Sequence, residues 1–148
     1  MCGAGYALRF PAVLREALRS GIIALPDALE TEFDEIPAYR GVTIRGDGPP
    51  YPLDRSDFLS QMERKQQNPN FPADPGRWEN YSCSCFTEMD ELMLSFHLPR
   101  KGKRIAKGPV SKTQGACVAD GSPHIHWFLY EGADPSPLFS VIEVDKNE

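Results

Sequence analysis

Fourteen prolines and twelve glycines, spread along 148 residues, are the feature that most limits the folds open to this chain. Proline fixes φ and removes a backbone donor, so long helices and central strands tolerate it poorly. The frequency of prolines and glycines predicts short elements joined by defined turns rather than a helical bundle. The length suits one domain, taken here as residues 1–148.

Composition excludes several classes of protein. Apolar residues make up 41% and charged residues 25%, which argues against wholesale disorder, and the net charge of -5 argues against nucleic acid as a partner. No apolar run approaches the ~20 residues that cross a bilayer. Without an export signal the chain is expected to be cytoplasmic, with its four cysteines as free thiols.

Apolar residues recur at helical spacing in three segments. Pro11 suits the first turn of the first helix and Gly21 its C-terminal cap, while Thr87 and Asp90 form a plausible capping pair for the third. The helices are expected over 10–20, from a capping residue within 54–57 to Asn68, and between 87 and 99.

Strand patterns follow mostly later in the chain, separated by turn residues. This order predicts a single α+β domain, with a helical N-terminal part at 1–37 and a sheet core at 38–148. The expected strands are 38–44, 81–86, 104–110, 124–130 and 138–144.

Arg40 and Gly41 form the first candidate site. An arginine within an apolar strand needs a partner for its charge, and its planar fork suits a phosphate or carboxylate. Gly41 would let a ligand approach the backbone closely. The alternative is an arginine that points to water or pairs with an internal acid.

Ser82 and Ser84 form the second candidate site. They lie on one face of a short strand, with Cys83 and Cys85 on the other face. Two hydroxyls on one face suit hydrogen bonds to an amide ligand. The alternative is a strand of small residues chosen for close packing, with its serines bonded to nearby backbone.

His124 and His126 form the third candidate site and share one face of a later strand. They suit a polar pocket or, together with a cysteine, a zinc site, although no pair here has zinc-ribbon spacing. The basic stretch 100–112 is a solvated face or a complement to an anionic ligand.

Taken in order, these three segments resemble the arginine class of ADP-ribosyltransferases. The resemblance spans about residues 38–144 and implies a split, mostly antiparallel sheet that binds NAD. It assigns Arg40 to the NAD diphosphate and Ser82 and Ser84 to the nicotinamide pocket, with transfer of ADP-ribose to an unknown acceptor as the implied activity.

The chain departs from that family at its Glu-x-Glu motif, where His124-Ile125-His126 stands instead. A protonated imidazole would oppose a transition state that builds positive charge, whereas a neutral one can orient a ribose hydroxyl. His124 or His126 is therefore assigned to the ribose, with His126 as a catalytic candidate. Glu131 is the alternative carboxylate if the strand register is shifted.

Three hypotheses follow from the sequence. The first is a domain that binds NAD or a related nucleotide, with or without transfer. The second is a non-catalytic domain that binds a protein partner through exposed aromatics such as Trp127 and Tyr130 and the basic stretch. The third is a metal-binding domain built on His124, His126 and a cysteine.

Overall fold

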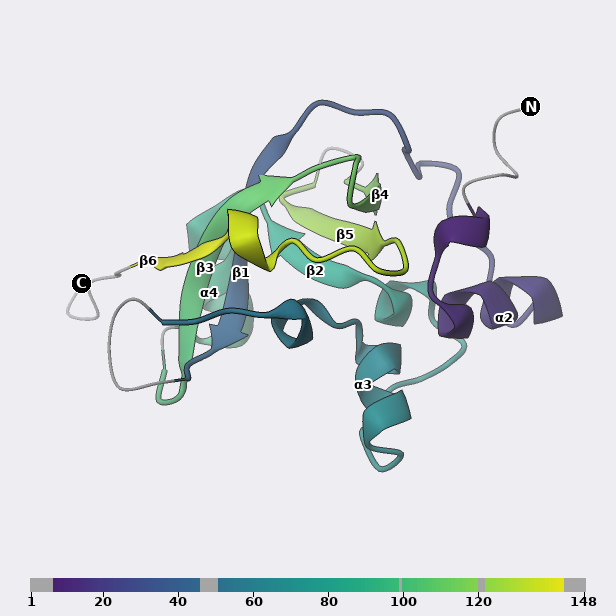
Figure 1. Ribbon diagram of the computed structural model, residues 1–148, viewed down its shortest axis with the longest axis horizontal. Coiled ribbons are helices and arrows are strands. Elements are labelled where there is room, and N and C mark those ends of the chain that lie inside the picture. Colours follow the sequence, from purple (N-terminus) through teal and green to yellow (C-terminus); the bar gives the residue numbers. More distant parts are fainter. Residues whose placement is uncertain (1–6, 46–50, 99, 120–121, 143–148) are drawn as a thin grey trace.

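The computed structural model describes residues 7–45, 51–98, 100–119 and 122–142, and within them six strands form one antiparallel sheet (Figure 1). The strand order is β4-β5-β2-β1-β3-β6. This arrangement confirms the predicted single-domain α+β class. The strands are β1 (Ile36–Thr43), β2 (Cys83–Phe86), β3 (Lys103–Val110), β4 (Gly115–Val118), β5 (His124–Leu129) and β6 (Ser140–Ile142).

The helices are short, as the proline and glycine content predicts. They are α2 (Ala12–Ser20), α3 (Gln61–Gln67) and α4 (Met89–Phe96), with 3-10 turns η1 (Ala7–Arg9), η2 (Arg55–Phe58), η3 (Trp78–Tyr81) and η4 (Ser136–Leu138). Gly21 ends α2 with φ at 81°, which confirms the predicted glycine cap. Pro11 is the N-cap rather than a residue of the first turn.

Two predicted helix starts are wrong. In both places the residue expected to cap the helix makes hydrogen bonds to another segment instead. Thr87 donates its N–H to the Pro123 carbonyl, so it still belongs to the sheet side of the junction and α4 begins at Met89 without a side-chain cap. Asp54 caps η2, and Ser60 then caps α3 through a reciprocal pair of bonds with Glu63. The second α-helix therefore begins at Gln61.

The boundary at residue 38 is also shifted. Ile36 and Pro37 were expected in the N-terminal part but belong to β1, where Pro37 lies opposite Pro109 of β3. Strand β4 was not predicted at all. The loop expected at 46–50 and the end of the last strand at 143–144 lie outside the described residues.

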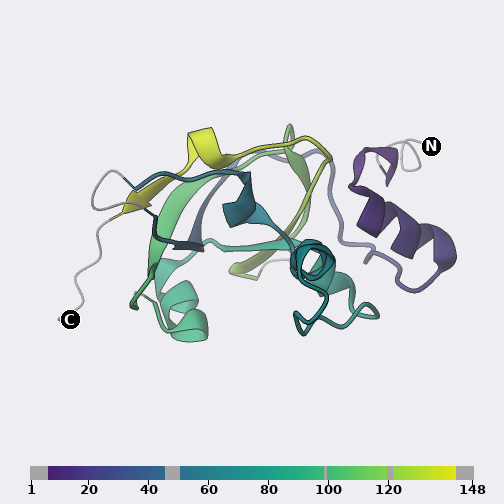
Figure 2. The same ribbon diagram turned by 60° about the horizontal axis from the view of Figure 1, so that its bottom comes forward.

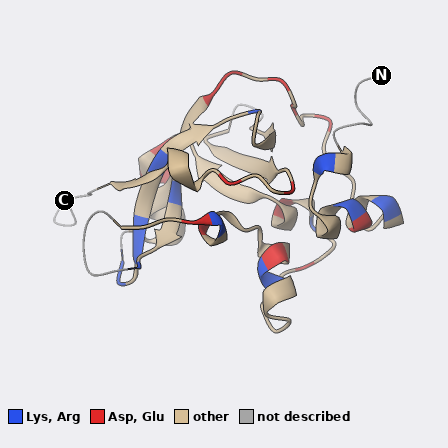
Figure 3. Ribbon diagram, in the orientation of Figure 1, with Lys and Arg blue, Asp and Glu red and all other residues tan. Residues whose placement is uncertain are grey.

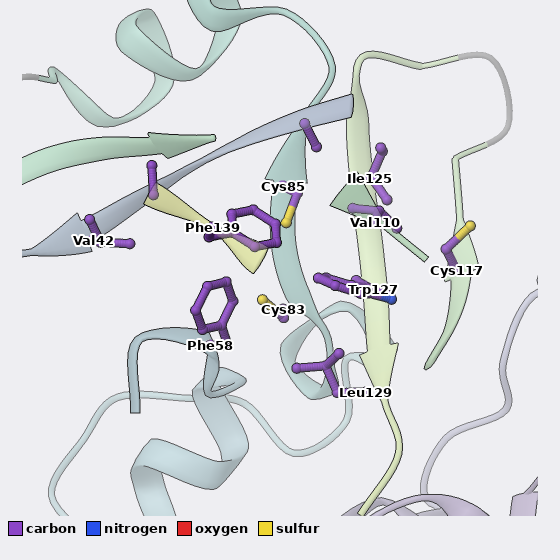
Figure 4. Close-up of a cluster of buried hydrophobic side chains, with 12 residues drawn as sticks. Val42, Phe58, Cys83, Cys85, Val110, Cys117, Ile125, Trp127, Leu129 and Phe139 are labelled. Carbon is purple, nitrogen blue, oxygen red and sulfur yellow. The ribbon is translucent and has the colours of Figure 1, made fainter. Parts of the chain in front are cut away.

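Elements cover both faces of the sheet. Figure 2 shows α4 below the sheet and the yellow η4 above it. On the η4 side, Phe58, Phe139 and Trp127 pack into one buried cluster with the three strand cysteines, Cys83, Cys85 and Cys117 (Figure 4). The other side carries two clusters: one beneath α4, with Leu92 and Ile105, and one where Phe10 and α2 meet β4 and β5.

Candidate functional site

The site begins at a gap in the middle of the sheet. β1 pairs along its length with β3, and β2 pairs along its length with β5. Between them, however, β1 and β2 pair at Tyr39 and Phe86. Arg40 lies just beyond that pair and is 8% exposed. Its Nη1 donates to the Ser84 carbonyl at 2.6 Å, so a side chain joins the strands where the backbone ladder ends.

Arg40 is held entirely by backbone carbonyls. Its Nε donates to the Asp57 carbonyl at 2.8 Å and its Nη2 to the Leu59 carbonyl at 3.4 Å. The Asp57 carboxylate instead binds Arg45, at 2.6 Å from Nη2. Among the residues that the structure describes, Arg40 therefore has no carboxylate partner, and neither alternative from the sequence, an exposed or an acid-paired arginine, describes it.

A pocket of about 210 Å³ opens beside Arg40. Gly41 of β1 and Ser82 and Ser84 of β2 contribute to its wall, so two of the three predicted segments meet there. Its other lining comes from α3, α4 and the segments around them: Leu59, Gln61, Arg64, Phe71, Glu79, Leu92, Phe96, Leu98, Arg100 and Lys103.

The lining is strongly cationic although the whole chain is acidic. Arg40, Arg64, Arg100 and Lys103 all line the pocket, and Figure 3 shows basic residues gathered on β1 and β3. Burial, followed by the charge of Arg40, lowers the pKa of Arg64. Burial also lowers the pKa of Lys103, with added repulsion from the three arginines. These cations destabilise one another, so a bound anion would stabilise them.

Arg64 is the cation in this lining that is least engaged. Its side chain is half-buried on α3 and makes no hydrogen bond or ion pair with any other described residue. By contrast, the Lys103 ammonium donates to the Thr43 hydroxyl at 2.7 Å, and Arg100 donates to the Phe96 carbonyl. A half-buried guanidinium without a counter-ion costs free energy unless a ligand supplies one.

Each serine hydroxyl is bonded to a histidine of β5. Ser84 Oγ lies 3.0 Å from His124 Nε2, and Ser82 Oγ lies 3.1 Å from His126 Nδ1. The imidazole rings are 4.2 Å apart, with His124 stacked on Phe86. The shared face predicted for the two histidines is confirmed, but they stand behind the serines and do not line the pocket.

The bonding of Ser82 fixes the tautomer of His126. The Ser82 hydroxyl donates to the Glu79 carbonyl at 2.8 Å, which uses its one proton. Towards His126 it can then only accept, so the imidazole carries its proton on Nδ1. Burial, reinforced by the neighbouring His124, lowers the pKa of His126 to about 4, and burial also lowers that of His124. Both rings are neutral at pH 7.

Glu131 does not reach this pocket. It is exposed after β5, where its carboxylate lies 3.4 Å from Arg15 Nη1 of α2. The strand register pairs Ser84 with His126 and Cys83 with Trp127, and so brings histidines rather than Glu131 beside the serines. The acidic residue that does line the pocket is Glu79, in η3.

Gly41 lines the pocket, but another side chain uses the room that it leaves. A Cβ at this position would lie 2.7 Å from Leu98 Cδ1. The glycine therefore lets Leu98, at the end of α4, pack against β1. The close approach predicted at Gly41 is made by an apolar side chain.

The cysteines lie on the opposite face from the serines, as alternation along β2 predicts. Cys83 and Cys85 are buried beside Phe58 and Phe139, and with Cys117 they are free thiols (Figure 4). No cluster of three or more His, Cys, Asp or Glu side chains suited to a metal occurs within the described residues. No described helix is long and apolar enough to cross a membrane.

In comparisons with known proteins, no family model, no curated protein and no solved structure matches this chain. The site is therefore interpreted from its own chemistry. Arg100 and Lys103 were anticipated as part of the basic stretch, but Arg64 and Glu79 were not. They stand in ordinary polar surroundings in the sequence, and only the packing of α3 and η3 brings them to the pocket.

Proposed function

We propose that this protein binds NAD or a related nucleotide in the pocket beside Arg40. The observation that carries the proposal is the joint presence of four cations, Arg40, Arg64, Arg100 and Lys103, in one pocket of an acidic chain. Phosphate oxygens would satisfy the free donors of Arg64, because a guanidinium matches their geometry with two parallel bonds.

The serine wall supports a nucleotide over a simple anion. The Ser82 hydroxyl already donates its proton to the Glu79 carbonyl, so it can only accept a hydrogen bond from a ligand. Ser84 lines the same pocket and presents a second hydroxyl. The Ser82 oxygen can therefore accept a bond from the N–H of a carboxamide, while the Ser84 hydroxyl can bond to its C=O. The histidines hold these hydroxyls in place through the bonds described above, and are therefore positioning residues.

The pocket size fits one end of a dinucleotide. Its volume of about 210 Å³ is below the roughly 300–1,000 Å³ of typical small-molecule pockets. The nicotinamide end would lie inside and the adenosine end outside. The resemblance to ADP-ribosyltransferases adds transfer of ADP-ribose from bound NAD to an acceptor as the reaction to assay once binding is measured.

Isothermal titration with NAD and with ADP-ribose tests the proposal. Arg64→Gln is the informative variant, because the Arg64 side chain makes no hydrogen bond or ion pair with another described residue, whereas the Arg40 side chain joins two strands. We expect Arg64→Gln to weaken binding of both ligands by about tenfold, the loss of one charged hydrogen bond. Arg19→Gln is the matched control, since Arg19 is an exposed helical arginine on α2.

Undetectable binding of both ligands at millimolar concentration, or equal affinity for wild type and Arg64→Gln, would contradict the proposal. The protein-partner hypothesis loses the two aromatic side chains that it named. Trp127 is 0% and Tyr130 4% exposed, so the expectation that they form an exposed aromatic surface is wrong. Both belong to the hydrophobic core.

A further inference from the structure

The pocket beside Arg40 has charges of opposite sign on different walls. Its cations come from β1, α3 and the start of β3. Within the described lining, Glu79 is the one acidic side chain, and it comes from η3, immediately before the serine strand. A ligand that carries only negative charge would be attracted by the first wall and repelled by the second.

The Glu79 carboxylate is held loosely enough to meet a ligand. Its ion pair to Arg77 is long, at 3.6 Å, and the Arg77 side chain is 63% exposed. The Glu79 side chain itself is 33% exposed. An exposed pair of this kind contributes little and is readily exchanged.

The position of Glu79 along the wall is set by its backbone. Its carbonyl accepts the Ser82 hydroxyl at 2.8 Å and the Ser82 N–H at 3.2 Å, which fixes η3 against β2. Its charge also acts on His126, where it favours the protonated form against the larger effect of burial. The carboxylate therefore belongs to the same wall as the Ser82–His126 pair.

We infer that Glu79 makes this pocket selective for a ligand that carries a cation as well as its phosphates, and so for the oxidised form of NAD over the reduced form. The inference rests on the proposed function. Oxidised NAD carries a positively charged pyridinium ring, whereas the dihydropyridine ring of NADH is neutral. The diphosphate and both riboses are the same, so the two ligands differ mainly in the group that the serine wall would receive.

Isothermal titration of the full chain with NAD and NADH tests this selectivity. We expect wild type to bind NAD about five- to tenfold more tightly than NADH, the effect of one partly screened charge pair. Glu79→Gln keeps the shape of the side chain and removes its charge, so it should weaken NAD binding by that factor, whereas NADH should bind as tightly as to wild type or more tightly because the repulsion of its phosphates is removed. Glu91→Gln, which alters an exposed acid of α4 outside the pocket lining, is the matched control.

The outcomes separate the two proposals. Equal affinity of wild type for NAD and NADH, or an equal loss for both ligands in Glu79→Gln, would overturn the role of Glu79 and leave the nucleotide pocket standing. Binding of neither NAD, NADH nor ADP-ribose would overturn the proposed function and the selectivity with it. Thermal unfolding of each variant establishes that it is folded at the titration temperature.

Discussion

The buried imidazole of His126 should make the stability of this fold depend on pH. In the folded protein the pKa of His126 is about 4, against 6.5 for a solvent-exposed histidine, because burial and the neighbouring His124 disfavour the protonated ring. Above pH 6.5 the ring is neutral in both states and stability is unaffected. As pH falls from 6.5 to about 4, only the unfolded chain takes up the proton, so the free energy of unfolding decreases.

The magnitude follows from the difference between the two pKa values. Between 6.5 and about 4 the largest possible loss is about 3.4 kcal/mol. At pH 4.5 the loss is not yet complete, and partial access of water to the ring reduces it further, so we expect about 2 kcal/mol. His124, whose pKa burial lowers in the same direction, adds to this loss, while the charge of Glu79 works against it.

Urea denaturation at pH 7.5, 6.0 and 4.5 would measure this effect in wild type and in His126→Asn. The asparagine amide can replace the Nδ1–H that donates to Ser82, but it does not titrate. Carboxylates protonate equally in both proteins, so their contribution cancels in the difference. Wild type should lose about 2 kcal/mol more than His126→Asn between pH 7.5 and 4.5. His97→Asn, at the exposed αL end of α4, is the control.

Parallel pH profiles for wild type and His126→Asn would refute the reasoning. They would mean that water reaches the imidazole freely, or that the Ser82–His126 bond does not hold the ring in its neutral form. A profile for His97→Asn that departs from wild type would show that histidines in general, and not the buried pair, control the pH dependence.

Three other substitutions have expected outcomes. Arg40→Lys keeps the charge but cannot serve all three carbonyls, so urea denaturation should show a loss of about 2–3 kcal/mol. Gly41→Ala should cost about 1 kcal/mol by displacing the flexible end of Leu98, and titration should show weaker NAD binding because Leu98 lines the pocket. Ser60→Ala removes one bond of the cap it shares with Glu63, and thermal unfolding should report a loss of about 1 kcal/mol.

The parts of this fold that the sequence predicted well are those in which a local pattern decides the structure. The alternation at the start of β5, where Ile125 and Trp127 are buried between the half-buried histidines, and the Gly21 cap needed no tertiary information. β4 escaped prediction because its four residues, Gly115–Val118, are buried on both faces and show no alternation. Its pairing with β5 and a bridge from Glu30 to Cys117 hold it in the sheet.

Of the site, the sequence could predict residue types within a strand but not what each side chain would meet. Ser82 and Ser84 share a face because β2 alternates, and that much was predicted. That the histidines of β5 stand behind these serines depends on register, which the pattern does not reveal. Glu79 and Arg64 reach the pocket from elements whose placement depends on tertiary packing alone.

Arg40 stabilises the fold at the same place where the proposed ligand would bind. At the opening in the centre of the sheet, the guanidinium of Arg40 supplies donors to the Ser84 carbonyl of β2 and the Asp57 carbonyl of η2, and it also places a positive charge in the opening. A library screened only for folded protein would return arginine there, whether or not the proposed nucleotide binding were also selected. Arginine at this position in a relative is therefore evidence of a shared architecture rather than of a shared function.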